Sequence, residues 1–207
     1  MVSVPRLQSL HHHARRICEE DVPGDFVECG VAAGGSSALV AVVIKRYSKR
    51  PRRLYSCDSF EGMPTPTDED AHDGVNAEDT GWGSGTCAAP QDSLGEICHA
   101  LGVWELVTPV KGYFETTLPD LKNQLDDIAF LHLDGDWYLS TRDILANLYD
   151  KVHSKGFMQA DDYGYWQGCS KALHEFEAQR GLRFKLQRID SSGVWFGKPV
   201  AGGKPSA

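Results

Sequence analysis

The sequence predicts a single α/β domain: a mostly parallel seven-stranded sheet with helices on both faces and an antiparallel hairpin at its C-terminal end. Three observations predict this fold. Short apolar runs alternate with helix-like runs five times, which is typical of a parallel sheet. Two strand-like runs then flank "DSSG" near the end of the chain, which is a hairpin signal. The 207 residues suit one domain better than two full ones.

The first part of the chain predicts a helix, a strand, a second helix and a second strand. Residues 7–20 mix apolar with charged side chains ahead of a Pro-Gly breaker, which indicates a polar helix. "DFVECGV" (25–31) is a short apolar strand. "GGSSALVAVVIKRY" (34–47) passes from small to apolar residues, so we expect a helix with a serine near its N-cap. "RRLYSCDSF" (52–60) is the next strand.

Residues 61–90 differ from the rest of the chain. They are rich in Gly, Pro, Asp, Glu and Thr and show little periodicity. A structureless stretch of about 30 residues is uncommon inside a compact domain and is usually functional or disordered. The second half carries Trp82 and several glycines, so we expect part of the segment to order over a ligand as a lid.

The remaining elements complete the alternation of strands and helices. Strands are expected at 105–110, 128–133 and 156–160. Helices are expected at 91–101, after Thr117, at 141–152 and at 169–181. The predicted organisation is a helical lead-in at 1–22, a main domain at 23–200 that contains the lid, and a loose tail at 201–207.

Composition excludes several classes of partner. The net charge is −8 without a long basic block, so nucleic acid is not an expected partner. No apolar run approaches the roughly 20 residues that span a bilayer, and the N-terminus lacks the pattern of a secretion signal. Six scattered cysteines form no C-x-x-C pair, so we expect neither zinc nor disulfides and place the protein in the reducing cytoplasm.

The stretch "ECGVAAGG" (28–35) predicts a nucleotide-like pocket. A strand, a glycine-bearing turn and a helix N-terminus allow a ligand to approach the backbone closely. Asp58 ends the next strand, where an acid can hold both hydroxyls of a ribose. The glycines do not fit the G-x-G-x-x-G fingerprint, which weakens an assignment to NAD.

Carboxylates follow the ends of two strands that are expected to be neighbours. Asp134 and Asp136 follow strand 128–133, and Asp161 and Asp162 follow strand 156–160. Carboxylates this close repel one another unless a cation neutralises them, and an all-oxygen ligand set favours Mg²⁺. Asp136 is placed to remove a proton from a hydroxyl bound at the ion. A helix cap or a turn is the alternative role for any single aspartate.

Aromatic residues gather just beyond the same strand ends. Trp82, Trp137 and the group 163–166 are expected to form the wall of a pocket. His132 lies inside a strand and is expected to be structural rather than catalytic. The triplet at 11–13 is expected to be solvated or locally packed, because consecutive helical side chains diverge by about 100°.

Five ordered blocks resemble the macrocin (TylF-type) O-methyltransferase family. They are "PGDFVECGVAAGGSS", "YSCDSFEGMP", "VKGYFETTLP", "LHLDGDWYLST" and "ADDYGYWQGCSKAL", which together span most of the chain. The resemblance implies a Rossmann-like class I fold that uses S-adenosylmethionine (SAM). It also implies Mg²⁺-dependent methyl transfer to a hydroxyl, usually of a sugar on a natural product.

The resemblance also implies roles for individual residues. Asp134, Asp161 and Asp162 are the implied metal ligands, and Asp136 is the implied general base. The implied SAM site comprises Glu28 and Gly30 at its methionine end, Asp58 at the ribose with Ser59 and Phe60 beside it, and Gly112 and Tyr113 at the adenine. Ser36 and Asp134 are further implied SAM-binding residues.

Three questions stay open at this point. The acidic residues also fit a metal-dependent hydrolase, and the fold also fits a non-catalytic SAM-binding or scaffold module. The acceptor is expected to be a small molecule with a vicinal diol, such as a sugar or secondary metabolite, but its identity is open. A homodimer is a further expectation, with the lead-in helix and the lid as its contact surfaces.

Overall fold

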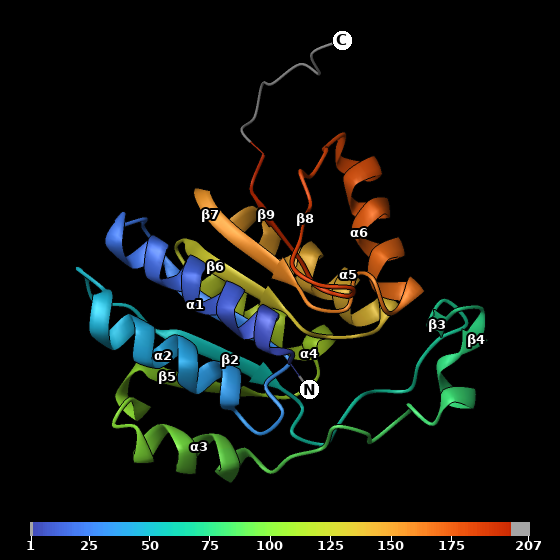
Figure 1. Ribbon diagram of the computed structural model, residues 1–207, viewed down its shortest axis with the longest axis horizontal. Coiled ribbons are helices and arrows are strands. Elements are labelled where there is room, and N and C mark those ends of the chain that lie inside the picture. The colour runs from blue at the N-terminus through green and yellow to red at the C-terminus, as the bar shows by residue number, and fades with distance from the viewer. Residues whose placement is uncertain (1, 200–207) are drawn as a thin grey trace.

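The computed structural model describes residues 2–199 and has a central sheet between two layers of helices (Figure 1). The strand order is β5-β2-β1-β6-β7-β9-β8. The strands are β1 (Asp25–Cys29), β2 (Leu54–Asp58), β5 (Val107–Lys111), β6 (Ile128–Leu133), β7 (Val152–Ala160), β8 (Gln187–Arg188) and β9 (Val194–Gly197). The first five are parallel, whereas β9 is antiparallel to both β7 and β8. The predicted sheet and its C-terminal hairpin are therefore confirmed.

Helices cover both faces of the sheet, as predicted (Figure 1). One layer contains α1 (Val4–Glu19), α2 (Gly35–Tyr47) and α3 (Gln91–Ala100). The other contains α4 (Phe114–Gln124), α5 (Tyr138–Leu148) and α6 (Gln167–Arg180). Strand side chains alternate between the layers: Phe26 and Phe130 pack with the first, Val27 and Leu131 with the second. Strand β6 is buried along its whole length because both of its faces are covered.

Helix α1 begins earlier and is more deeply buried than its polar composition predicts. Ser3 caps it by accepting a hydrogen bond from the Arg6 N–H at 3.3 Å, and Pro5 lies in the first turn. One face, which includes Leu10 and Ile17, is buried in the same apolar layer as α2. His13 is also buried, against Phe157 and Trp195. The division at residue 22 stays a prediction, and the expected tail at 201–207 lies outside the described residues.

The region predicted as helix 141–152 contains three elements. Helix α5 ends at Leu148, a 3₁₀ turn covers Tyr149–Lys151, and β7 begins at Val152. Residues 153–155 lack the apolar alternation of a strand because their side chains are largely exposed. Two further 3₁₀ turns cover Ala77–Thr80 and Trp104–Leu106. Within residues 2–199, no helix combines the length and apolar character needed to cross a bilayer.

The segment 61–90 is folded onto the rest of the domain. It contains a small hairpin of β3 (Ala71–His72) and β4 (Val75–Asn76), which lies beside the start of α6 (Figure 1). A small apolar cluster holds the segment in place and contains Met63, Ala77, Trp137, Trp166 and Cys169. We call residues 61–90 the lid segment from here on.

Candidate active site

A cavity of about 860 Å³ opens at the C-terminal ends of the parallel strands. Ligands of open α/β sheets bind at this edge. The turn after β1, the end of β2, the lid segment, the start of α4 and the "LDGDWY" stretch all contribute to its wall. Its volume lies near the upper end of the roughly 300–1,000 Å³ range for small-molecule sites.

The glycine turn after β1 forms one side of the cavity. Gly30 has φ +99°, and a Cβ there would overlap the carbonyl oxygen of Asp134, so only glycine fits. Asp58 accepts the N–H groups of Val31 and Ala32 at 2.7 and 3.0 Å, which fixes the turn. Asp58 therefore lines the cavity and also shapes its backbone.

Most of the predicted site residues line this cavity. They are Gly30, Ser36, Asp58, Ser59, Gly112, Tyr113, Asp134, Asp136 and Asp162. Three predicted residues do not line it: Glu28, Phe60 and Asp161 are buried behind its wall. Phe60 belongs to the apolar layer of α1 and α2, and Glu28 and Asp161 belong to a polar network described below.

One end of the cavity is lined by Asp134, Asp136 and Asp162, whose negative charges are not fully compensated. We call it the acidic end. Asp162 is buried, and its Oδ2 atom has no hydrogen-bond partner among the described residues. Burial and the neighbouring charge of Asp161 raise the pKa of Asp162 to about 6. Burial, followed by repulsion from Asp161 and Asp162, raises the pKa of Asp134 well above its usual range. This end of the cavity is thus a site that favours a cation.

A row of polar side chains crosses the sheet just below the acidic end. Ser56, Glu28, His132 and Gln159 occupy matched register positions on β2, β1, β6 and β7. His132 Nδ1 lies 3.0 Å from Glu28 Oε1, and His132 Nε2 lies 3.0 Å from Asp161 Oδ1. We call Ser56, Glu28, His132 and Gln159 the polar row.

The charge of the polar row is balanced at its centre. Burial alone would lower the pKa of His132, but Asp161 and Glu28 outweigh burial and raise that pKa well above its usual value. Burial alone would raise the pKa of Asp161, but His132, Gln159 and Arg6 hold it below its usual value. The imidazolium therefore bridges two carboxylates, and the prediction that His132 is structural agrees with this arrangement.

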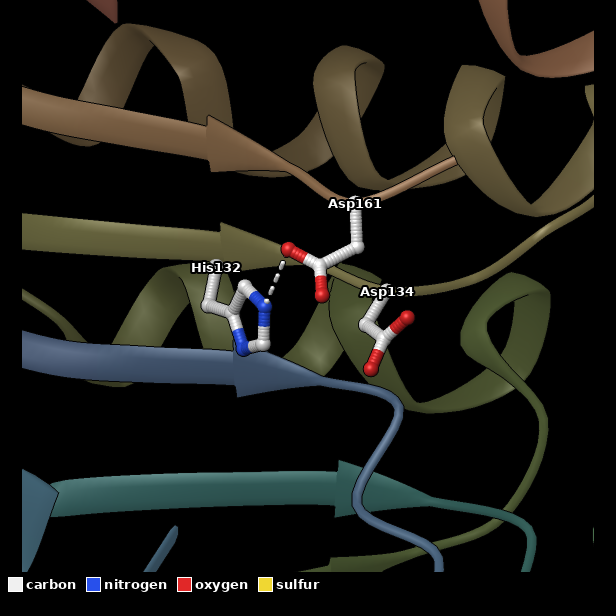
Figure 2. Close-up of side chains that lie close together, drawn as sticks. All are labelled: His132, Asp134 and Asp161. Carbon is white, nitrogen blue, oxygen red and sulfur yellow. Dashed lines mark hydrogen bonds and ion pairs between the residues drawn. The ribbon is translucent and has the colours of Figure 1, made fainter. Parts of the chain in front are cut away.

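One ligand atom from each of His132, Asp134 and Asp161 lies within 4.8 Å of the others. Figure 2 shows His132 and Asp161 pointing toward each other, with the Asp134 carboxylate beside them. Both ring nitrogens of His132 already contact carboxylates, so the imidazole has no nitrogen free for a metal. The oxygen ligands of the acidic end thus remain the better donor set for a hard cation.

Asp136 has an unusual backbone conformation. Its φ is +56°, in the left-handed region, and the N–H of Trp137 donates back to the Gly135 carbonyl at 2.6 Å. The left-handed residue of this turn is Asp136 and not the neighbouring Gly135, and aspartate tolerates this conformation better than most residues. Burial and the charge of Asp162 raise the pKa of Asp136 well above its usual range, while the indole N–H of Trp166 opposes this by donating at 3.2 Å.

The lid segment is fastened directly to the residues after Asp136. Trp137 donates its indole N–H to the Pro64 carbonyl at 2.8 Å. Asp70, which is fully buried, accepts the N–H of Tyr138 at 2.7 Å and the N–H of Thr67 at 2.7 Å. These contacts join the lid segment to the start of α5.

The aromatic wall is largely as predicted. Trp82, Trp137, Tyr165 and Trp166 line the cavity. Tyr163 does not, because its hydroxyl pairs with His174 on α6 at 2.9 Å.

Sequence reasoning missed two residues of the site, Arg6 and Asp70. Arg6 lies in the first turn of α1 and contacts Asp161, which is 155 positions away in the sequence. The Ser3 cap followed by Pro5 could have shown that the helix includes Arg6. No sequence signal distinguishes Asp70 from the other acidic residues of the lid segment.

Comparisons with known proteins identify the family of the chain. Residues 1–198 match the family described as Macrocin-O-methyltransferase (TylF). The chain is 32% identical to the 8-demethyl-8-(2,3-dimethoxy-alpha-L-rhamnosyl)-tetracenomycin-C 4'-O-methyltransferase of Streptomyces olivaceus, over 95% of this chain and 74% of that relative. It is 31% identical to the demethyldecarbamoylnovobiocin O-methyltransferase of Streptomyces niveus, over the same shares.

A solved structure has the same fold. The O-methyltransferase NovP is 30% identical to this chain and superimposes with a TM-score of 0.83, over 95% of this chain and 80% of that one. The predicted Rossmann-like class I methyltransferase fold is therefore confirmed. The five ordered motifs, the site at the strand ends and these matches lead to one conclusion: the chain belongs to the TylF macrocin O-methyltransferase family.

Proposed function

We propose that this enzyme transfers a methyl group from SAM to one hydroxyl of a vicinal diol on a sugar or another small natural product, with Mg²⁺ at the acidic end. The observation that carries the proposal is one cavity with two chemically different ends. The glycine turn and Asp58 form one end, and Asp134, Asp136 and Asp162 form the other. Relatives named as O-methyltransferases of a rhamnosyl-tetracenomycin C and of demethyldecarbamoylnovobiocin support the acceptor class.

The donor end suits a nucleoside with a charged tail. Gly30 and the turn after it leave the backbone open toward the cavity, and the start of α2 offers Ser36 there. Asp58 retains acceptor capacity for a ribose because each carboxylate oxygen can accept more than one hydrogen bond. Gly112 and Tyr113 line the cavity beside it, where a flat adenine ring can stack.

The residues present at the acidic end fit a divalent cation. Asp162 has a buried oxygen without a hydrogen-bond partner among the described residues, and the carboxylates of Asp134, Asp161 and Asp162 repel one another. Both features favour the binding of a positive charge. Asp134 and Asp162, with Asp161, are the residues that would hold it. When bound, Mg²⁺ would neutralise this cluster and lower the pKa of a hydroxyl that contacts it.

Asp136 is the proposed general base. Asp136 lines the cavity beside the proposed metal ligands, and Trp166 orients its carboxylate by donating a hydrogen bond at 3.2 Å. As the acceptor oxygen bonds to the methyl carbon, the carbon–sulfur bond of SAM breaks and its electron pair stays on sulfur. The hydroxyl proton moves to Asp136. Trp137 and residues of the lid segment line the cavity, where they would limit the access of water to this step.

The proposal is tested with purified enzyme, SAM and a panel of sugar-bearing natural products, by following a mass gain of one methyl group. We expect SAM-dependent methylation that EDTA abolishes and Mg²⁺ restores. Full activity in EDTA would remove the metal from the proposal. Calorimetry that detects no SAM binding would overturn the proposal as a whole, and SAM binding without turnover on any diol would favour a non-catalytic module.

A further inference from the structure

Arg6 reaches the acidic end from outside all five sequence motifs. Its Nη1 atom donates to both Asp161 Oδ2 and the Asp161 carbonyl at 3.3 Å. Its Nε atom donates to Asp190 Oδ2 at 3.2 Å. The side chain is 14% exposed and lines the cavity. A guanidinium is thus already present at the proposed Mg²⁺ site.

The two carboxylate oxygens of Asp161 have different hydrogen-bond partners. Oδ1 contacts His132 at 3.0 Å and Gln159 at 2.9 Å, which tie it to the polar row. Oδ2 has Arg6 as its only hydrogen-bond partner among the described residues. A cation that uses Asp161 must therefore approach Oδ2, the atom that Arg6 contacts.

Further carboxylates also act on Arg6. The carboxylates whose negative charge acts on the guanidinium are those of Asp161, Asp190, Asp162 and Asp134. Three of these four are the proposed metal ligands. The same negative charge thus holds Arg6 and would attract a divalent ion.

We propose that Arg6 is a built-in counter-cation of the acidic end, which competes with the divalent metal for Asp161 Oδ2. This inference rests on the proposed function, because it concerns the metal assigned there. Metal binding breaks the contact between Arg6 and Asp161 Oδ2, and the acidic end keeps a compensating charge in both states.

The surroundings of Arg6 allow it to give up one contact without leaving the site. Asp190 stays as a partner, and it is fixed by Ser3 Oγ at 2.5 Å and by the N–H of Gly193 at 2.7 Å. Gly193 also lies against the Arg6 stem, where a Cβ would clash. The guanidinium therefore remains close after it releases Asp161, and its positive charge continues to oppose the metal.

The test measures Mn²⁺ and Mg²⁺ binding to the metal-free full chain by calorimetry, at about pH 8 to limit proton competition. We expect Arg6→Gln to bind either ion about tenfold more tightly, because one opposing charge is removed. Arg6→Lys keeps the charge and should bind within about threefold of the wild type. Arg15→Gln is the matched control: it removes an exposed arginine of the same helix that pairs with Glu19 at 2.8 Å, far from the acidic end, and should not change metal affinity.

Thermal unfolding gives a second readout. Metal-free Arg6→Gln should melt at a lower temperature than the wild type, and saturating Mg²⁺ should raise its midpoint by more than it raises that of the wild type. If the wild type binds metal and Arg6→Gln binds it equally or more weakly, Arg6 is not a competitor and the inference fails alone. If neither protein binds metal, the metal part of the proposed function fails with it.

Discussion

Replacing His132 with glutamine should show how much the polar row stabilises the fold. The imidazole is 1% exposed and lies 3.0 Å from each of two buried carboxylates, those of Glu28 and Asp161. Glutamine can still donate a hydrogen bond, but it carries no charge. The substitution therefore leaves two buried anions with their central cation removed, while the volume of the site changes little.

The magnitude follows from opposing electrostatic contributions. At an effective dielectric of about 20, two unit charges about 4 Å apart attract by about 4 kcal/mol, so the two contacts contribute about 8 kcal/mol before desolvation. Desolvation of three buried ions offsets most of this attraction in the intact protein. When one partner is removed, the desolvation of the others is left uncompensated, and such losses are about 3–5 kcal/mol. We expect His132→Gln to lose about 3–5 kcal/mol of unfolding free energy.

Urea unfolding in the presence of a chelator, followed by tryptophan fluorescence, measures this loss. His12→Gln changes an exposed histidine of α1 and should stay within about 0.5 kcal/mol of the wild type. The double variant His132→Gln/Asp161→Asn should lose less than the sum of the two single losses, because it also removes one of the unpaired anions. A loss below about 1 kcal/mol for His132→Gln, with an unchanged urea dependence, would refute the charge-balanced row.

Three further predictions concern the base, the lid segment and a buried histidine. Asp136→Asn tolerates the left-handed backbone and should lower kcat at least about 100-fold at saturating SAM with little loss of stability, whereas Asp136→Ala should also lose about 1 kcal/mol in urea unfolding. Asp70→Ala leaves the N–H groups of Thr67 and Tyr138 unpaired, so amides of the lid segment should exchange hydrogen faster by mass spectrometry, while those of β6 should not. Burial, with the nearby charges of His12 and Arg16, lowers the pKa of His13 to about 4. The buried neutral His13 therefore contributes fully to stability above about pH 6.5, and this contribution is lost as the pH falls toward 4. Urea unfolding should show that the difference in unfolding free energy between the wild type and His13→Phe changes by roughly 1–2 kcal/mol across this pH range, after allowance for solvent screening.

The sequence predicts the parts of this protein that follow from local patterns. Apolar runs of strand length and amphipathic helices give the alternation, and parallel strands bring their C-terminal ends to one edge. Asp134 and Asp162 can therefore be placed together from the amino-acid sequence alone. Residues 153–155 were missed because an exposed part of β7 has no apolar pattern, although its backbone still forms a strand.

Contacts between distant parts of the chain could not be predicted in this way. Arg6 meets Asp161 across 155 positions, and Tyr138 meets Asp70 across 68. Neither pair lies in a repeating pattern, because each contact depends on how a whole element packs. The contacts of Glu28 could not be predicted for a related reason: the pleat of β1 turns its side chain toward Ser37 on α2 and toward His132 on β6.

The polar row explains why the acidic end can stay ordered despite its charge. Its four members share one register line and project toward the face covered by α1 and α2, as the Ser37 contacts show. Asp161 forms hydrogen bonds with His132 on β6, Gln159 on β7 and Arg6 on α1. Among the described residues no side-chain cation contacts Asp134 or Asp162 directly, and the charges of His132 and Arg6 act on them only from a distance. We therefore expect an incoming metal to change the charge of these two carboxylates most. The fold thus places cations in direct contact with the negative charge of Asp161 but not with the charges of Asp134 and Asp162. We therefore expect Asp134→Asn or Asp162→Asn to weaken metal binding more than Asp161→Asn does.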